Sequence, residues 1–221
     1  MGIHDYHTEM KKVIIFGSGL IAELAHYYFT SDSYYEVAGF TVDEEYVDED
    51  SFLGLPLISF NRITNHFPPD KYDFFVALSY SNHNILREEK FRAAKRMGYS
   101  LVSYVSSKAT ILNNDAIGDN CFILENNVIQ PFVTICDNVT LWSGNHIGHH
   151  STIKENVFIA SHVVVSGGVE IGKNTFIGVN STVRDHIAIG QNNIIGAGSL
   201  IMKSTKDNEI YVPERTKIRN E

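Results

Sequence analysis

The stretch from Ile153 to Ile177 reads IKENVFIASHVVVSGGVEIGKNTFI, and a branched aliphatic residue recurs in it at every sixth position. A period of six fits neither the roughly 3.6-residue turn of an α-helix nor the simple alternation of a strand, and it is typical of a solenoid of short strands. The recurrence extends without a gap in both directions, through Val105, Ile111, Ile117, Ile123, Ile129, Ile135, Leu141, Ile147, Ile153, Ile159, Val165, Ile171, Ile177, Val183, Ile189, Ile195 and Ile201.

Three hexads make one triangular coil of 18 residues, so residues 18 apart should stack at the strand spacing with the aliphatic side chain pointing to the axis. We therefore predict an all-β parallel β-helix over residues 101–203. Glycines directly after the aliphatic residue are expected where the chain turns a corner, at Gly118, Gly148, Gly172, Gly178, Gly190 and Gly196. Smaller residues four places after it are expected to fill the interior, among them Cys121, Val133, Ser151, Val163, Thr175, Ser181 and Ser199.

The first hundred residues have a different pattern. Three apolar runs predict strands, at Lys11–Phe16, Val37–Phe40 and Phe74–Leu78. Amphipathic segments predict helices from about Ile21 to Phe29 and from about Ile85 to Met97. We predict an α/β, Rossmann-like β-α-β-α-β unit over residues 1–100.

A glycine loop, Gly17-Ser18-Gly19, lies between the first predicted strand and helix. Backbone N–H groups at such a helix N-terminus can hold a phosphate, and Asp43 follows the second strand where an acidic residue can meet a ribose. The alternative is that the loop only makes a tight turn. Because the unit is half of a dinucleotide fold, we expect it to bind a mononucleotide or the nucleotide end of a nucleotide-linked sugar.

The composition limits the partners. The 221 residues carry a formal charge of −8, which opposes association with nucleic acid or an anionic membrane. Cys121 and Cys136 lack a zinc-type spacing and are expected to be buried thiols in a reducing compartment. With no run long enough to span a membrane, we expect a cytoplasmic protein.

Histidines concentrate on the repeat, at His146, His149, His150, His162 and His186. Imidazole suits a general base that removes a proton from an attacking amine or hydroxyl, whereas several imidazoles together could bind a metal. His150 and His186 share a face but lie two coils, or about 10 Å, apart, which is too far for one metal within a chain. We predict no metal site, although ligands from neighbouring subunits, or hydrated surface histidines without a role, stay open as alternatives.

Motifs along nearly the whole chain resemble a family of bacterial sugar acyltransferases. This family includes sialic acid O-acetyltransferases and N-acetyltransferases of nucleotide-linked amino-deoxysugars. The resemblance implies a left-handed β-helix, a homotrimer, acetyl-CoA as co-substrate in the groove between neighbouring helices, and a nucleotide-linked sugar held by the N-terminal unit. It is carried by Val13–Gly19, Val37–Phe40 with Asp43, Gly54-Leu55-Pro56, Ala77-Leu78-Ser79, His149 with Ser151-Thr152-Ile153, Ser166–Gly172 and Ile195–Ser199.

The resemblance also implies roles for single residues. His149 corresponds to the family's proposed base, which an acidic residue usually follows; here the next residue is His150. A second family histidine, which helps to bind acyl donor or acceptor, falls at Phe158, and His146 or His162 is a candidate substitute. Ser79, with the glycine loop and Asp43, is expected to bind the sugar nucleotide.

Two further groups are candidates for the cofactor. Backbone N–H groups at Gly167 and Gly168 could stabilise the negative charge that develops on the thioester oxygen. Candidate partners of the CoA phosphates are Lys173 and Lys203, with Arg184 and Arg215 as further cations.

Together these features predict an acetyltransferase that acylates the amino group of a nucleotide-linked amino-deoxysugar for lipopolysaccharide or another surface glycan. The nearest alternative is O-acetylation of a hydroxyl on sialic acid or another glycan sugar. More distant alternatives are a trimeric metal-dependent hydratase and a non-catalytic scaffold. Residues 204–221, where the hexads have stopped, are expected to form a tail in which Ile210–Pro213 covers the last coil.

Overall fold

The computed structural model describes residues 10–112 and 116–214. Its contacts divide the chain into two compact units. The first contains the residues up to Leu78 together with Ala93–Leu101, and the second contains Ser79–Arg92 together with the residues from Val102 onward. Segment Ser79–Arg92, which we had placed in the N-terminal domain, thus belongs by its contacts to the repeat unit. Among the described residues, no helix has the length and apolar character needed to cross a membrane.

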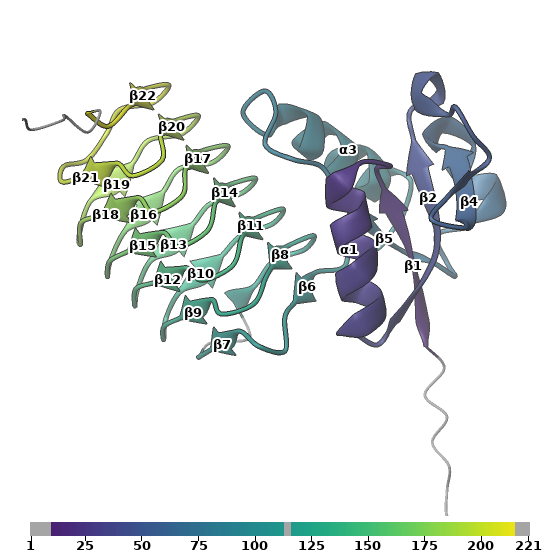
Figure 1. Cartoon of the computed structure of the whole chain (residues 1–221), viewed down its shortest axis with the longest axis horizontal. Coiled ribbons are helices and arrows are strands. Elements are labelled where there is room, and N and C mark those ends of the chain that lie inside the picture. Colours follow the sequence, from purple (N-terminus) through teal and green to yellow (C-terminus); the bar gives the residue numbers. More distant parts are fainter. Residues whose placement is uncertain (1–9, 113–115, 215–221) are drawn as a thin grey trace, which may run out of the picture. The chain divides into compact units, whose positions relative to one another are not determined.

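The first unit is built on a five-stranded sheet of order β3-β4-β2-β1-β5, in which β4, β2, β1 and β5 run parallel and β3 is antiparallel to β4 (Figure 1). The strands are β1 Lys11–Phe16, β2 Tyr35–Val42, β3 Ser51–Phe52, β4 Leu55–Ser59 and β5 Asp73–Val76. The helices are α1 Leu20–Ser31, η1 Glu44–Tyr46, η2 Phe60–Arg62, α2 Ile63–His66 and α3 Ile85–Arg96, of which α3 begins in the second unit.

The predicted α/β unit is therefore confirmed, with two strands more than expected, β3 and β4. Val13, Ile14 and Ile15 are fully buried because β1 is central and is covered on both faces. Strand β4 was missed because Pro56 lies within it, and proline argues against a strand.

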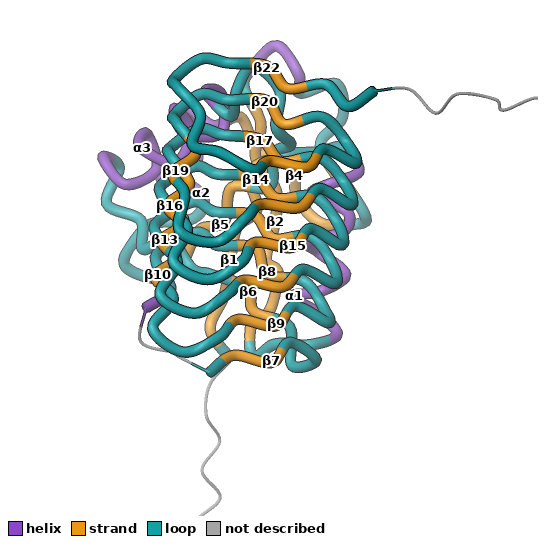
Figure 2. The backbone as a smooth tube through the Cα atoms, turned by 90° about the vertical axis from the view of Figure 1, so that its left-hand side faces the viewer, coloured by secondary structure: helices purple, strands orange, loops and turns teal. Residues whose placement is uncertain are grey.

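The second unit is the predicted parallel β-helix. Each strand from Tyr104–Val105 to Leu200–Ile201 is two residues long and ends on the aliphatic residue of its hexad, and each pairs with a strand 18 residues away, as Thr134–Ile135 does with Thr152–Ile153. Figure 2 shows the strands of each face stacked in a column. The strands are β6 Tyr104–Val105, β7 Thr110–Ile111, β8 Phe122–Ile123, β9 Val128–Ile129, β10 Thr134–Ile135, β11 Thr140–Leu141, β12 His146–Ile147, β13 Thr152–Ile153, β14 Phe158–Ile159, β15 Val164–Val165, β16 Glu170–Ile171, β17 Phe176–Ile177, β18 Thr182–Val183, β19 Ala188–Ile189, β20 Ile194–Ile195, β21 Leu200–Ile201 and β22 Ile210–Tyr211.

These strands form three sheets. One has the order β22-β20-β17-β14-β11-β8-β6, the second β21-β18-β15-β12-β9-β7, and the third β10-β13-β16-β19. The aliphatic residues from Ile123 to Ile201 are at most 5% exposed, and so are the predicted interior residues such as Cys121 and Ser151. The interior of the β-helix is thus the one expected from the sequence.

The corners of the coil are made differently from our prediction. The left-handed backbone conformation falls on the third residue after each aliphatic position, at every sixth residue from Asn120 to Gly198, and asparagine is the commonest occupant. The glycines directly after the aliphatic residue serve close packing between coils: a Cβ on Gly172 would lie 2.5 Å from the backbone nitrogen of Gln191.

One corner carries a ladder of buried asparagines. The Nδ2 of Asn120 donates to Asn138 (2.8 Å), Asn138 donates to Asn156 (2.9 Å) and Asn156 donates to Asn174 (3.2 Å). Asn174 continues the ladder into segment Ser79–Arg92, where it donates to the Glu88 carboxylate at 2.9 Å. The segment therefore covers this edge of the β-helix.

Arg87 anchors the covering segment. Its guanidinium is buried, donates to Thr140 Oγ1 and to the backbone oxygen of Asn156 (3.0 Å), and stands 5.7 Å from the ring centre of Phe158. No carboxylate among the described residues pairs with it, and burial lowers the pKa of Arg87 to about 10. Hydrogen bonds and the aromatic face thus offset the cost of burying this cation.

At the C-terminal end, β22 pairs with β20 and so covers the last strand edge of its sheet. The Gly196 N–H donates to the Tyr211 oxygen at 2.7 Å. Residues 215–221, including the candidate Arg215, lie outside the described residues.

Val165 and Val164 offer a matched test of the core, since both lie on β15 and are 0% and 40% exposed. Val165→Ala should lower the free energy of unfolding by roughly 2–3 kcal/mol, because it leaves a cavity in a dry interior. Val164→Ala should cost less than about 1 kcal/mol. Urea unfolding followed by circular dichroism measures both, and equal effects would contradict the inward orientation of the hexad position.

Arg87 and Arg92 offer a second matched pair on α3. Arg87→Ala should lower the free energy of unfolding by roughly 2–4 kcal/mol and speed hydrogen exchange in residues 79–92, because buried acceptors lose their donor. Arg92 is exposed, and its ion pair within the described part of the chain is with Glu88, so Arg92→Ala should cost less than about 0.5 kcal/mol. Protection of residues 79–92 that survives in Arg87→Ala would show that the segment is anchored elsewhere.

Candidate functional site

His149 and His150 occupy the corner that follows strand β12. Both side chains are exposed, and their Nδ1 atoms lie 3.0 Å apart with the rings nearly perpendicular. The His149 backbone N–H donates to Gln130 Oε1 at 2.9 Å. The two adjacent imidazoles therefore form one hydrogen-bonded pair.

Gly167, one coil further on, makes room for the His149 ring. A Cβ on Gly167 would lie 2.7 Å from His149 Cε1 and 2.8 Å from Nε2, so any side chain at position 167 would displace the imidazole. The structure thus brings together His149 and the glycine pair, as the sequence suggested.

The two glycine N–H groups are not equivalent, which corrects our expectation for the pair. The Gly168 N–H donates to the His149 carbonyl oxygen at 2.8 Å and is already used in the coil. Among the described residues, none accepts a hydrogen bond from the Gly167 N–H. Gly167 is therefore the one member of the pair that keeps a donor for a ligand.

The other repeat histidines lie apart from this pair. His146 is half-buried on β12, between Val128 and Val164 of the neighbouring strands, and no contact joins it to His149 among the described side chains. His162 and His186 repeat a simpler arrangement, in which each ring lies over the glycine one coil earlier, Gly144 or Gly168. These rings contact the backbone, and neither pairs with another imidazole of the described residues.

Phe158 does not fit the cofactor role implied for it. Its side chain is 3% exposed and packs against Tyr80 (5.1 Å between ring centres), Phe176 (5.7 Å) and the Arg87 guanidinium. A ring covered on its outer face has no surface left for acetyl-CoA. The sequence contained a signal for this burial, because Phe158 and Phe176 are 18 residues apart and stack on each other. Two stacked aromatic rings on an outer face need other residues to shield them from water.

The remaining candidates for binding acetyl-CoA are single cationic side chains that do not form a cluster with one another in the described residues. Lys173 and Lys203 are exposed, and Arg184 lies 3.6 Å from the carboxylate of Asp185. The cysteines take no part: Cys121 is buried, which raises its pKa to about 12, whereas Cys136 is only half-buried, contrary to our expectation. No group of three or more histidine, cysteine or acidic side chains in the described parts of the chain is placed to hold a metal.

In the first unit, the predicted nucleotide residues lie at the carboxyl ends of the parallel strands, where ligands bind in open α/β sheets. Gly17 has φ +130° and donates to the Thr41 oxygen at 2.8 Å, and a Cβ there would lie 2.8 Å from the Ala77 oxygen. Ser18 and Gly19 follow it, with Gly19 at the N-terminus of α1, and Asp43 precedes η1 after β2. Ser79 belongs to the other unit.

The sequence analysis missed a polar cluster at this same edge. The Glu44 carboxylate accepts hydrogen bonds from Asn61 (2.5 Å), Arg62 (2.5 Å) and Ser59 (3.3 Å). Hydrogen bonds from Asn61 and Arg62 hold the pKa of Glu44 below its usual range. Asn61 and Arg62 directly follow β4, so recognising that strand would have located them.

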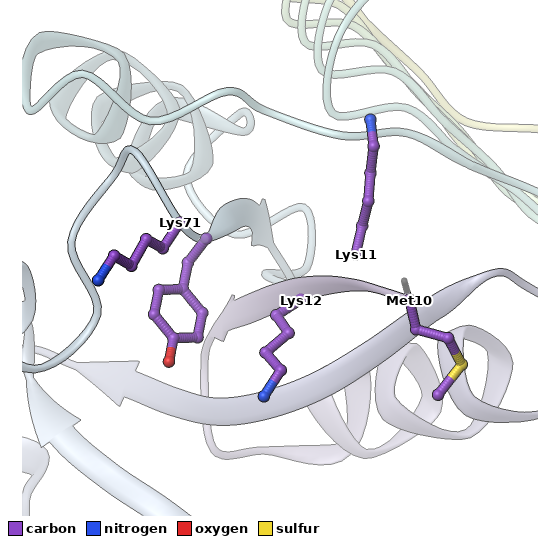
Figure 3. Close-up of a pocket in the computed structure, with 5 residues that line it drawn as sticks. Met10, Lys11, Lys12 and Lys71 are labelled. Atoms are coloured by element: carbon purple, nitrogen blue, oxygen red, sulfur yellow. The ribbon is translucent and has the colours of Figure 1, made fainter. Parts of the chain in front are cut away.

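A pocket of about 420 Å³ lies at the other end of β1 and is lined by Met10, Lys11, Lys12, Lys71 and Tyr72. Figure 3 shows the Lys11 and Lys12 side chains pointing in opposite directions from the strand. Its three lysines are exposed, and the length of β1, about 20 Å, separates it from the Gly17 loop. It is therefore not part of the predicted nucleotide site.

Comparisons with known proteins agree with this architecture. Residues 116–149, 134–167 and 168–203 match the family model of the bacterial transferase hexapeptide (six repeats). No curated protein matches the sequence significantly.

Solved structures match nearly the whole chain. The acetyltransferase domain of PglB from Neisseria gonorrhoeae is 20% identical with a TM-score of 0.77, over 90% of this chain and 95% of that one. A histidine-to-asparagine mutant of perosamine N-acetyltransferase from Caulobacter crescentus, in complex with CoA and GDP-perosamine, is 22% identical with a TM-score of 0.79, over 95% and 98%. WeeI from Acinetobacter baumannii is 18% identical with a TM-score of 0.68, over 90% and 95%.

At these identities the structures establish the fold, an α/β unit followed by a left-handed parallel β-helix. The matches to the hexapeptide model lie within residues 116–203, which are part of the β-helix.

Proposed function

We propose that the protein is an acetyl-CoA-dependent N-acetyltransferase that acylates the amino group of a nucleotide-linked amino-deoxysugar. The observation that carries the proposal is the exposed His149 imidazole, held over Gly167 and paired through Nδ1. The order of an α/β unit and a β-helix, shared along nearly the whole chain with a perosamine N-acetyltransferase, supports the choice of an amino acceptor over a hydroxyl.

The chemistry needs one base and no acyl-enzyme. The amine nitrogen attacks the thioester carbon while His149 Nε2 accepts the amine proton. The tetrahedral intermediate then breaks its C–S bond, and the leaving CoA thiolate takes that proton from the imidazolium. The products are the amide and free CoA, and His149 returns to its neutral form.

Gly167 would contribute the second element of catalysis. Its N–H, which has no acceptor among the described residues, is suited to donate to the thioester oxygen as negative charge develops there. Gly167 also leaves room for the His149 ring, so the base and the N–H donor lie next to each other in adjacent coils.

The first unit would bind the sugar nucleotide at the carboxyl edge of its sheet. The N–H groups of Ser18 and Gly19 at the start of α1 suit a phosphate, Gly17 makes the tight turn that presents them, and Asp43 suits a ribose hydroxyl. Lys173 and Lys203 remain the candidates for the CoA phosphates.

The assembly and setting are part of the proposal. Leu200 is an outward residue of β21 and is 65% exposed, which favours a homotrimer that covers it and places acetyl-CoA between neighbouring helices. Acetyl-CoA as co-substrate and two free thiols favour the cytoplasm, where precursors of lipopolysaccharide and other surface glycans are made.

The primary test is release of CoA from acetyl-CoA with a panel of nucleotide-linked amino-deoxysugars, sialic acid and the matching free sugars, with product masses. His149→Ala should reduce turnover by roughly 10²–10⁴-fold, because the base is lost. His186→Ala is the matched control, since its ring also lies over a glycine at a coil corner, and it should keep full activity. Turnover that survives in His149→Ala would remove this residue as the base.

A second test addresses the nucleotide edge. Asp43→Asn should raise KM for the sugar nucleotide roughly 10- to 100-fold while KM for acetyl-CoA stays constant, because a charged acceptor of a ribose hydroxyl is lost. Asp70→Asn, an exposed change in the same unit, is the control. Steady-state kinetics with each substrate varied would separate the effects, and an unchanged KM for the nucleotide sugar would contradict the placement.

A further inference from the structure

We propose that His150 is a positioning residue that fixes the tautomer of His149, and that Phe132 holds His150 in place. The inference rests on the proposed function, since it concerns the base of that reaction. It starts from the 3.0 Å contact between the two Nδ1 atoms.

Two proton arrangements satisfy an Nδ1–Nδ1 contact, because one ring must donate and the other accept. If His150 donates, the His149 proton lies on Nε2, and that nitrogen cannot act as a base. If His149 donates, its Nε2 lone pair is left for the substrate amine. Only the second arrangement is productive, so His150 must serve as the acceptor.

The position of the His150 ring is fixed from its other side by Phe132, one coil earlier. The two ring centres lie 4.6 Å apart and the planes are tilted by 38°. Phe132 occupies a corner position with φ +64°, where most other coils have asparagine, glycine or histidine. A bulky residue in this region is conformationally costly, and its contact with His150 is the compensating interaction that the structure shows.

A carboxylate in place of the His150 imidazole would fix the tautomer of His149 more strongly. It accepts and never donates, so it would hold His149 in the productive tautomer, and its charge would stabilise the imidazolium that forms during attack. A neutral imidazole holds the tautomer more weakly. His150→Glu should therefore preserve or raise kcat, whereas His150→Ala should lower kcat about 10- to 100-fold, the usual cost of losing such a supporting group.

The experiment compares His150→Ala, His150→Glu and Phe132→Asn with His186→Ala as control. His186 is at the same corner two coils further on, with its ring over Gly168, but contacts no second imidazole. We expect kcat to fall in His150→Ala and, less strongly, in Phe132→Asn, with both KM values unchanged. His150→Glu should recover activity, and His186→Ala should match the wild type.

A spectroscopic measurement separates this inference from the proposed function. Long-range proton–nitrogen NMR spectra of nitrogen-15 histidine-labelled protein at mildly alkaline pH report which ring nitrogen carries the proton, and the His149 signals are identified by their loss in His149→Ala. We expect the wild type and His150→Glu to show the proton on His149 Nδ1, and His150→Ala to move it to Nε2. A His149 tautomer that is the same in wild type and His150→Ala would overturn the inference, whatever the activity. An absence of transferase activity with the expected tautomers would instead count against the proposed function alone.

Discussion

The rise of one coil per 18 residues is the constraint on which the rest of the repeat unit depends. It places an aliphatic side chain on the axis and a left-handed residue at a corner in every hexad from Ile117 to Ile195, so each position repeats its environment one coil later. Residues of equal register therefore meet directly, as in the asparagine ladder from Asn120 to Asn174. Hydrogen bonds between like side chains and dispersion contacts between like aliphatics are both consequences of this stacking.

The same constraint decides where chemistry can be placed. Inward positions hold the aliphatic core, whereas corner positions can carry exposed polar rings. His149 and His150 lie at such a corner, with Gly167 and Phe132 above and below them in the neighbouring coils. A rigid stack thus sets the distance between groups that are remote in sequence, which is how a solenoid pre-organises a site.

The sequence predicted the periodic part of the structure well, because every hexad repeats the same evidence. The interior residues and the stacking of residues 18 apart both followed from this period. The cover formed by Ser79–Arg92 could not be predicted in this way. Arg87 contacts Thr140 and Asn156, and these contacts have no period and join residues far apart in the chain. Strand β4 was not predicted because it contains Pro56, and the Glu44–Arg62 cluster beside it was therefore missed as well. The pairing of His149 with His150 depends on ring orientations, which the spacing of residues does not specify.

The register also restricts how the length of this chain can change. Removing one residue inside a hexad would turn every later aliphatic side chain away from the axis, and the stacked pairs around Gly167 and Phe132 would be broken together. A duplication or loss of one whole coil would keep every environment intact and alter only how far the site lies from each end of the helix. Insertions and deletions should therefore be tolerated in steps of one coil, or as loops that leave at a corner and return to it.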